Sequence, residues 1–410
     1  MFSKVEDYIK ENWKNTIRQS GAELHGIVKI PFSYTTPCMD EAFIDFYYWD
    51  TYFTNRGLLR CDMKKQVENN LDTMKYFIDA IGYVPNANHI LDRSQPPLFT
   101  AGVWDLYHFT KDTHVIEKYI DSIIRELDFW EYDRMTPCGL NAYGTNASRV
   151  ELINNCEWLC ERVGVRLPEN IDDRIRMCRN LYSIAESGWD FTPRFQTERN
   201  CFEADEFVEL DLNCILYDAE VKTAKMLRVV NRDEEAERLE EKYKNRKILM
   251  DHYMKDPKTG IYYDYNFRKN CFSSITSCAS FYVYAMGISN NKQAAAKLLK
   301  RLELPYGLAA CEKRPGEVYL QWDYPTMWPS NVYFAVHGLK EIGLYEEAKR
   351  IAIKYVNTVN MCFEKTGLLW EKYDALKGSV SVTREYDTPA MMGWTAGVYL
   401  DMQHMIKGLK

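Results

Sequence analysis

The stretch EEAERLEEKY (Glu234–Tyr243) decides the fold, because a close copy, EEAKRIAIKY (Glu346–Tyr355), returns later in the chain. Each copy is followed by a second matching stretch, KTGIYYDY (Lys258–Tyr265) after the first and KTGLLWEKY (Lys365–Tyr373) after the second. A charged helical segment followed by a Gly-containing loop is therefore one structural unit, and that unit is repeated.

The loop signal of this unit recurs along the whole chain. A Gly followed by an apolar residue and then a polar or aromatic cluster is found at Gly82, Gly139, Gly188, Gly260, Gly307 and Gly367. The intervals between these glycines fit two helices with their connecting loops. Between them the periodicity is helical, most clearly in the apolar stripe Ile116, Tyr119, Ile120, Ile123, Ile124, Leu127 and Trp130. Six helical hairpins predict an all-α fold, an (α/α)6 toroid whose loops surround a central funnel at one end.

The length of 410 residues alone suggests two or three domains, at roughly 150 residues per domain. No Pro/Ser/Gly-rich linker or charge block divides the sequence, however. We therefore expect residues 1–410 to form a single (α/α)6 barrel domain, with residues 1–30 as a leading helix and lead-in segment.

Charge and motifs exclude several classes of partner and cofactor. The 52 Lys and Arg against 59 Asp and Glu give a net charge of −7, which disfavours nucleic acid or an anionic membrane as a partner. The N-terminal stretch MFSKVEDYIKENW carries frequent charges, so we expect neither a signal peptide nor a membrane span. No nucleotide-binding Gly motif occurs, and the 12 Cys and 7 His lack metal-ligand spacing, so no cofactor or metal is expected. Scattered single cysteines favour a reduced, cytoplasmic protein, and oligomeric state is left open.

Aromatic residues are abundant and gather in the loops. The chain holds 29 Tyr, 18 Phe and 10 Trp, or 14% aromatic residues. Loop clusters combine rings with acids, amides and Arg: Phe46–Phe53, Val84–Pro97, Glu186–Phe195, Gln321–Trp328, Leu368–Asp374 and Thr383–Asp387. Rings cover the apolar faces of a sugar while polar groups satisfy its hydroxyls, so the clusters predict a carbohydrate site.

The loop motifs resemble, in order, those of the trehalase family, glycoside hydrolase family 37, with family 63 as its neighbour. The motifs are YYWD (Tyr47–Asp50), DRSQPP (Asp92–Pro97), ESGWDF (Glu186–Phe191), DLN (Asp211–Asn213), QWDYP (Gln321–Pro325), EKYD (Glu371–Asp374) and GWTAGV (Gly393–Val398). The resemblance covers about residues 30 to 400. It implies an (α/α)6 barrel that hydrolyses an α-glucosidic bond with inversion.

The resemblance also implies roles for three acids. Asp190 corresponds to the general acid, and its neighbours Trp189 and Phe191 would form apolar walls beside it. Glu371 corresponds to the general base, and it occupies the register of Asp264 in the KTG repeat, so we expect both on funnel-facing loops. Glu385 is the second candidate base, or a residue that positions the water. Without the family, Asp190 could instead cap a turn, and Glu371 could form a surface salt bridge.

Further motif residues are implied to bind the substrate. Asp50 and Arg93 resemble groups that hold hydroxyls of the glycone, the sugar on the non-leaving side. The other residues expected in the pocket are Trp49, Asn88, Gln95, Trp189, Gln321, Trp322 and Asp323. A purely structural role remains open for Trp49 and Trp322, and Asp323 could instead fix a loop by accepting backbone N–H groups.

The sequence departs from the family where the second sugar is held. Ala42 stands at the position of a family Arg, and the stretch from Tyr132 to Glu186 lacks a match to another Arg-bearing element. Thr326–Trp328 differs from the family's Asn-Gly-Trp, and Lys377–Thr383 replaces a Gly-rich lid. The leaving group could therefore be another sugar, or a small acid such as glycerate held by Arg384 or Arg194.

The leading interpretation is an inverting, exo-acting α-glycosidase of a short α-glucoside, with trehalose as the first candidate. The alternatives are a related α-glucosidase acting on another disaccharide or on glucosylglycerate, and a sugar-binding toroid without turnover. An isomerase or lyase on the same barrel is less favoured, since such enzymes use a His or Tyr base and only His89 lies in an acid-bearing loop.

Overall fold

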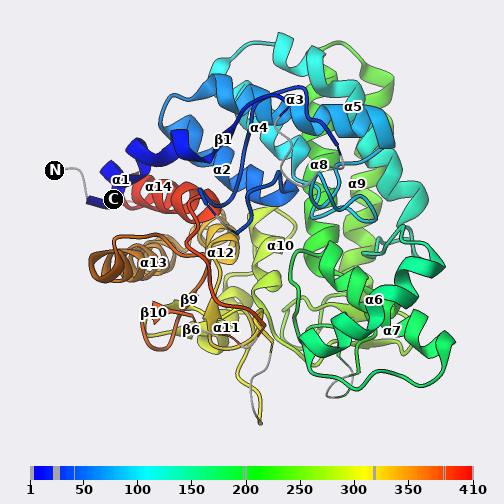
Figure 1. The fold of residues 1–410 in the computed structure, drawn as a ribbon. Coiled ribbons are helices and arrows are strands. Elements are labelled where there is room, and N and C mark those ends of the chain that lie inside the picture. Colours follow the sequence, from blue (N-terminus) through cyan, green and yellow to red (C-terminus); the bar gives the residue numbers. More distant parts are fainter. Residues whose placement is uncertain are drawn as a thin grey trace.

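The computed structural model describes residues 4–21, 28–40, 42–196, 198, 201–316, 320–381, 383 and 385–408. Helices dominate these residues (Figure 1): α1 (Lys4–Asn12), α2 (Tyr48–Arg60), α3 (Lys64–Ile81), α4 (Phe99–Thr110), α5 (His114–Asp133), α6 (Arg149–Val163), α7 (Ile171–Glu186), α8 (Leu210–Val229), α9 (Asp233–Tyr253), α10 (Tyr282–Ala285), α11 (Lys292–Leu302), α12 (Pro329–Glu341), α13 (Tyr345–Thr366) and α14 (Gly393–Gly408). The 3₁₀ helices are Trp13–Thr16, Ala204–Glu206 and Cys278–Phe281.

The strands are short, antiparallel and confined to the connections between helices. They are β1 (Ile17–Arg18), β2 (Tyr34–Thr35), β3 (Phe207–Val208), β4 (Tyr265–Asn266), β5 (Cys271–Phe272), β6 (Glu303–Leu304), β7 (Gly307–Leu308), β8 (Thr326–Met327), β9 (Tyr373–Asp374) and β10 (Ser379–Val380). Two of the small sheets have the orders β3-β4-β5 and β10-β9-β8. In the second, Tyr373 pairs with Met327 on one side and with Val380 on the other, which joins two loops of the funnel end.

Among the described elements, six helices pack side by side in a closed inner ring: α2, α4, α8, α10, α12 and α14. The ring closes where α14 returns to α2, and Gly57 of α2 faces Gly397 of α14 there. A Cβ at Gly397 would overlap the backbone oxygen of Phe53, so the close approach requires Gly. The predicted all-α (α/α)6 toroid is confirmed.

The outer layer consists of α3, α5, α9, α11 and α13, each following its inner helix in the chain. The repeated sequence units correspond to α9 and α13. The predicted stripe of α5 is buried, from Ile116 to Trp130, apart from Ile124, which is half-buried. Helix α1 reaches the outer layer through a ring contact of 5.0 Å between Tyr8 and Phe363 of α13.

The loop glycines mark the funnel end, with one difference from the prediction. Five of them follow helices of the outer layer. Gly188 instead follows α7, which belongs neither to the inner ring nor to the outer layer. The pair α6–α7 is an additional hairpin with its own small core, formed by Leu152, Cys156, Leu159, Cys160, Ile175, Cys178 and Leu181 with apolar residues of the following loop. Its apolar residues face one another rather than the ring, so helical periodicity alone could not separate this hairpin from the ring pairs.

A buried ion pair attaches the hairpin to the barrel. Glu186, the last residue of α7, is fully buried and accepts two hydrogen bonds of 2.9 Å from Arg134. It also accepts the backbone N–H groups of Ser94 at 2.8 Å and Gly144 at 2.5 Å. The end of α7, where the ESGWDF motif begins, is therefore fixed to two loops of the barrel.

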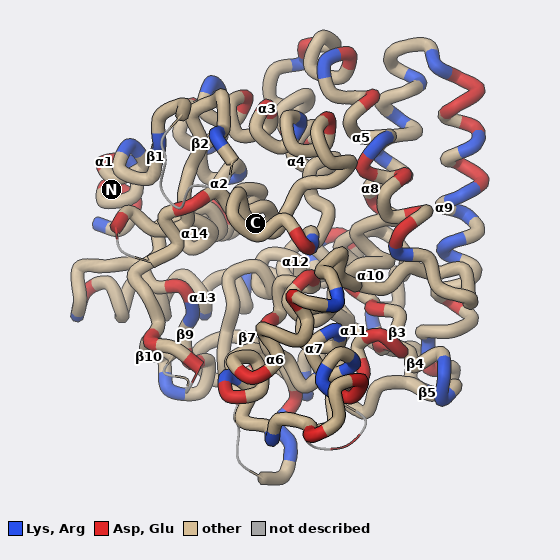
Figure 2. Tube along the Cα trace, turned by 45° about the vertical axis from the view of Figure 1, so that its right-hand side comes forward, with Lys and Arg blue, Asp and Glu red and all other residues tan. Residues whose placement is uncertain are grey.

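The described surface carries both signs of charge. Figure 2 shows Lys and Arg interspersed with Asp and Glu along outer helices such as α9. Within the described ranges, no helix combines the length and apolarity needed to cross a bilayer. The twelve cysteines all lie in these ranges, as thiols rather than in disulfides.

Candidate active site

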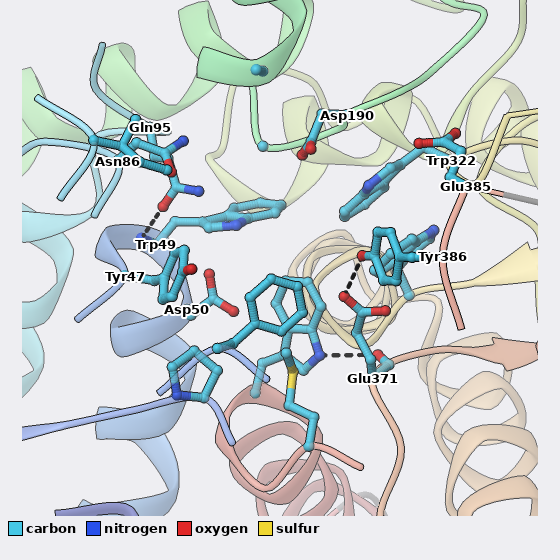
Figure 3. A pocket seen from close by; sticks show the side chains of 18 of the residues that line it. Tyr47, Trp49, Asp50, Asn86, Gln95, Asp190, Trp322, Glu371, Glu385 and Tyr386 are labelled. Carbon is cyan, nitrogen blue, oxygen red and sulfur yellow. Dashed lines mark hydrogen bonds between the residues drawn. The ribbon is translucent and has the colours of Figure 1, made fainter. Parts of the chain in front are cut away.

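A pocket of about 610 Å³ opens at the end of the barrel where the inner helices begin. It is lined by Pro37, Phe43, Tyr47, Trp49, Asp50, Asn86, Ile90, Arg93, Gln95, Trp158, Glu161, Arg162, Ala185, Gly188, Asp190, Trp322, Trp328, Glu371, Glu385, Tyr386, Met391 and Trp394. Several carboxyl groups and several aromatic rings thus share one cavity. Figure 3 shows Asp190 entering from one side, with Asp50 and Glu371 across the pocket from it.

Asp190 lies at the more open side of the pocket. Its side chain is 32% exposed, and its Oδ2 atom is 2.9 Å from Nη2 of Arg162. The backbone oxygen of Asp190 accepts a hydrogen bond of 2.5 Å from the side-chain amide of Gln321. The carboxyl group is therefore both positioned and open to solvent.

Glu371 is held from both of its carboxylate oxygens. Lys372 donates to Oε2 at 2.5 Å and Tyr386 donates to Oε1 at 2.6 Å (Figure 3). The backbone oxygen of Glu371 accepts from the indole of Trp394 at 3.0 Å. The salt bridge to Lys372 does exist, but both residues are buried, so it belongs to the wall of the pocket rather than to the surface.

Glu385 lies in a more buried part of the pocket wall that also contains Glu371. Its Oε1 accepts the backbone N–H of Gln321 at 2.9 Å, and its Oε2 is 3.4 Å from Nε of Arg162. Burial raises the pKa of Glu385 to about 7, although Arg162 and the Gln321 backbone oppose the rise. Arg162 thus bridges Asp190 and Glu385.

Asp50 lies in the first turn of α2 and lines the buried side of the pocket, with 7% of the residue exposed. Burial raises the pKa of Asp50 to about 8, and the nearby carboxyl groups of Glu371 and Asp190 add to the rise. The raised pKa favours the protonated carboxyl group, which donates one hydrogen bond as well as accepting others.

Aromatic residues form the floor of the pocket. Trp322 stacks on Trp328 with 3.8 Å between ring centroids, and Trp49 lies 5.8 Å from Trp322. Trp394 meets Trp328 edge-on at 5.6 Å. Trp49 and Trp322 are almost fully buried and also line the cavity, so each packs in the core and faces the ligand space.

Eight of the sequence-predicted residues meet in this pocket: Trp49, Asp50, Arg93, Gln95, Asp190, Trp322, Glu371 and Glu385. Gln95 also accepts the backbone N–H of Trp49 at 3.1 Å, which fixes the start of α2. Arg93 lies over the ring of Tyr182 at 4.6 Å and pairs with Asp92 at 2.6 Å.

Four predicted residues lie behind the lining of the pocket. Asn88 accepts the backbone N–H of Phe46 at 3.1 Å, and Trp189 is buried against Trp322 at 5.0 Å. Gln321 connects the backbone of Asp190 to Lys372 and Glu385. Asp323 accepts hydrogen bonds from Arg314 at 2.5 Å and from the backbone N–H of Tyr324 at 2.7 Å. Asp323 therefore fixes its loop, which is the alternative to substrate binding that the sequence left open.

Several lining residues are not among those that the sequence predicts. Tyr47, Asn86 and Tyr386 belong to loop clusters that the sequence did single out, so chemistry alone could have named them. Arg162, Glu161 and Trp158 come from α6, where no motif matches, and only the three-dimensional packing brings them to the pocket.

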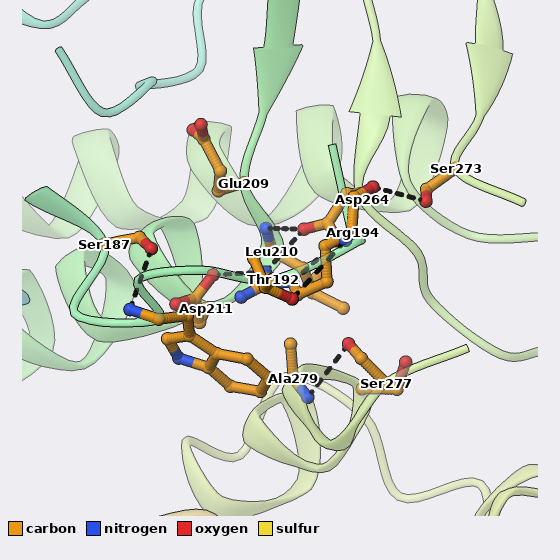
Figure 4. Close-up of polar contacts among 12 residues, drawn as sticks. Ser187, Thr192, Arg194, Glu209, Leu210, Asp211, Asp264, Ser273, Ser277 and Ala279 are labelled. Carbon is orange, nitrogen blue, oxygen red and sulfur yellow. Dashed lines mark hydrogen bonds and ion pairs between the residues drawn. The ribbon is translucent and has the colours of Figure 1, made fainter. Parts of the chain in front are cut away.

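Asp264 and Arg194 do not reach the pocket, contrary to expectation. Figure 4 shows them in a buried cluster with Asp211, in which Arg194 is 2.5 Å from Asp211 and 2.7 Å from Asp264. Burial lowers the pKa of Arg194, but Asp211 and Asp264 raise it more, so the net shift is upward. Arg194 also covers the ring of Trp189 at 4.4 Å. It cannot hold a leaving group there, and Arg384 lies outside the described residues.

This cluster supports the loop that carries Asp190, and its loss should be costly. The Arg194→Leu variant leaves two carboxylates buried without a cation, so we expect the free energy of unfolding to fall by about 3–5 kcal/mol. Arg149→Ala, which removes an exposed ion pair with Asp172, should cost about 1 kcal/mol or less. Urea unfolding of both variants checks this, and equal losses for the two would contradict the buried-cluster account.

Within the described part of the chain, no group of three or more His, Cys, Asp and Glu residues is arranged to hold a metal ion. The carboxyl groups of the pocket are themselves suited to acid–base chemistry. Two such groups facing one cavity can transfer a proton to a leaving oxygen and activate water.

Known proteins resemble this chain in sequence and in fold. Periplasmic trehalase of Salmonella newport is 27% identical over 401 residues, which cover 93% of this chain and 69% of the relative. Neutral trehalase Nth1 from Saccharomyces cerevisiae superposes with a TM-score of 0.74 at 22% identity, covering 98% of this chain and 80% of that one. The GH63 mannosylglycerate hydrolase from Thermus thermophilus, in complex with Tris and D-glycerate, gives 0.66 at 15% identity, covering 97% and 99%. The trehalase family model matches residues 2–407, and the chain therefore belongs to the trehalase family.

Proposed function

We propose that this protein is an inverting, exo-acting α-glycosidase, with trehalose as the leading candidate for its substrate. The observation that carries the proposal is one pocket, buried on one side, that Asp50, Asp190, Glu371 and Glu385 all line. A pocket of this form accepts the end of a short glycoside, and membership of the trehalase family supports an α-linked glucose there. Residues 1–410 act in this proposal as one catalytic domain.

Asp190 is assigned as the general acid. The acid protonates the oxygen that leaves with the second sugar. The partial exposure of Asp190 lets its carboxyl group take up a proton from solvent between turnovers. The hydrogen bond from Gln321 to its backbone holds the donor in place while the bond breaks.

Glu371 is assigned as the general base that removes a proton from the attacking water. Lys372 and Tyr386 each donate to one of its oxygens and compensate the charge of a carboxylate at that position. Glu385 is assigned to positioning the water, since Arg162 and the Gln321 backbone hold it in the same wall.

The remaining lining residues bind the glycone. Asp50 is both donor and acceptor for neighbouring hydroxyls, and Arg93, Asn86 and Gln95 supply further polar contacts around it. Trp49 covers the apolar face of the sugar ring. Asn88, Trp189, Gln321 and Asp323 act by holding these residues in position.

The leaving group is tested with a panel of α-linked glucosides. Trehalose, other α-linked disaccharides and glucosylglycerate are incubated separately with the protein, and released glucose is measured. Turnover of trehalose with the highest kcat/KM supports the proposal. A higher kcat/KM for glucosylglycerate would favour the alternative that the leaving group is glycerate. Two observations motivate this alternative: Ala42 stands at the position of a family Arg, and a structural relative is in complex with D-glycerate. Failure to release glucose from any member would favour a binding protein.

We also propose that the protein works in a reducing compartment such as the cytoplasm, although the Salmonella relative is periplasmic. All twelve cysteines are thiols rather than disulfide partners, and most of them are buried. A disulfide-free chain needs no oxidising environment to fold. Recovery of the protein in the periplasmic fraction of its source cells would contradict this assignment.

A further inference from the structure

Helix α6 presents a large exposed ring at the mouth of the pocket. Trp158 is 57% exposed, although Trp is normally among the well-buried residues. Its side chain nevertheless lines the catalytic cavity. An exposed indole beside a sugar site has an apolar face free to be covered by a ligand.

Trp158 belongs to one face of α6. Glu161 and Arg162 follow it by three and four residues, so the three side chains project on the same side of the helix. All three line the pocket. The guanidinium of Arg162 lies 5.8 Å from the Trp158 ring and contacts Asp190 at 2.9 Å. Arg162 therefore links this face of α6 to the wall of the pocket that carries Asp190.

The exposed fraction of the lining residues increases from the buried side of the pocket to its opening. Trp49 and Glu371 are only 2% and 3% exposed, whereas the Asp190 side chain is 32% exposed and Trp158 is more exposed still. A general acid lies beside the bond that breaks. The glycone therefore occupies the buried side, and the leaving group extends past Asp190 toward α6.

We propose that Trp158 is the stacking platform for the leaving sugar, with Glu161 accepting hydrogen bonds from its hydroxyls, so that the extra hairpin α6–α7 determines leaving-group specificity. The indole covers the apolar C–H face of the pyranose, and the carboxylate at its edge satisfies the polar rim. This assignment rests on the proposed glycosidase function, because it takes Asp190 as the acid.

Two substrates separate this role from a general one. Trehalose carries a leaving sugar, whereas α-glucosyl fluoride has the same glycone and a leaving group too small to reach α6. The Trp158→Ala variant should lose about tenfold in kcat/KM for trehalose, mainly through a higher KM, and should keep its kcat/KM for α-glucosyl fluoride. Trp158→Phe should recover most of the loss, since it keeps a flat ring.

Tyr132→Ala is the matched control. Tyr132 is 79% exposed on α5 and lies outside the pocket lining, so its removal should leave both substrates unaffected. Unchanged trehalose kinetics in Trp158→Ala, or an equal loss with α-glucosyl fluoride, would overturn the assignment while leaving the glycosidase proposal intact. No turnover of either substrate by the unchanged protein would overturn the proposed function, and this assignment with it.

Discussion

The Asp190→Asn variant is expected to lose at least ~10³-fold in kcat for trehalose hydrolysis. Asparagine has the same shape as the acid and can still contact Arg162, but it has no proton to give to the glycosidic oxygen. The loss should be much smaller with α-glucosyl fluoride, because fluoride leaves with little need for protonation. Steady-state kinetics on the two substrates measure both values.

Asp172→Asn is the control for this prediction, since Asp172 is exposed on α7 and pairs with Arg149. It should leave both rates unchanged. Near-full activity of Asp190→Asn on trehalose would remove Asp190 from the role of acid. An equal loss on both substrates would point to a role in binding or folding rather than in proton donation.

The Glu371→Gln variant is expected to lose at least ~10³-fold in kcat on both trehalose and α-glucosyl fluoride. Every substrate of an inverting enzyme needs an activated water, so the nature of the leaving group should not soften this loss. Gln keeps the shape of the side chain and its contact with Tyr386. Glucose binding, followed by tryptophan fluorescence, should remain measurable because the Trp floor is intact.

Glu385→Gln distinguishes the two candidate bases. If Glu385 positions the water, its variant should lose less activity than Glu371→Gln on both substrates. The opposite order, with Glu371→Gln retaining substantial turnover, would transfer the role of base to Glu385.

The ring of helices was predictable from local sequence, whereas the hairpin outside it was not. Stripes such as Ile116 to Trp130 are buried as their periodicity predicts, because one apolar face per helix suffices to define a layer. Helices α6 and α7 have the same periodicity, but their apolar faces pack on each other. Only tertiary contacts distinguish a hairpin of the ring from the additional hairpin α6–α7. The loop at Gly188 was therefore indistinguishable in sequence from the loops of the ring.

The candidate acids were predictable because motifs place them in loops, but their surroundings were not. Asn86 and Asn88 are two residues apart in an irregular loop, and nothing in the sequence tells which one faces the cavity. Asp264 and Glu371 share a register in the repeat, yet Arg194 captures Asp264 in a buried cluster. Arg162 reaches Asp190 from a helix without any family motif, so its role depends on the position of the whole hairpin.

The most direct test of the central claim is the anomeric configuration of the first glucose released from trehalose. Proton NMR at an enzyme concentration high enough to outpace mutarotation records this before the anomers equilibrate. Inversion at the attacked carbon gives one β-glucose, while the leaving sugar departs as α-glucose, so the two anomers should first appear in equal amounts. Initial release of α-glucose alone would show retention and would contradict an inverting mechanism through Asp190 and Glu371.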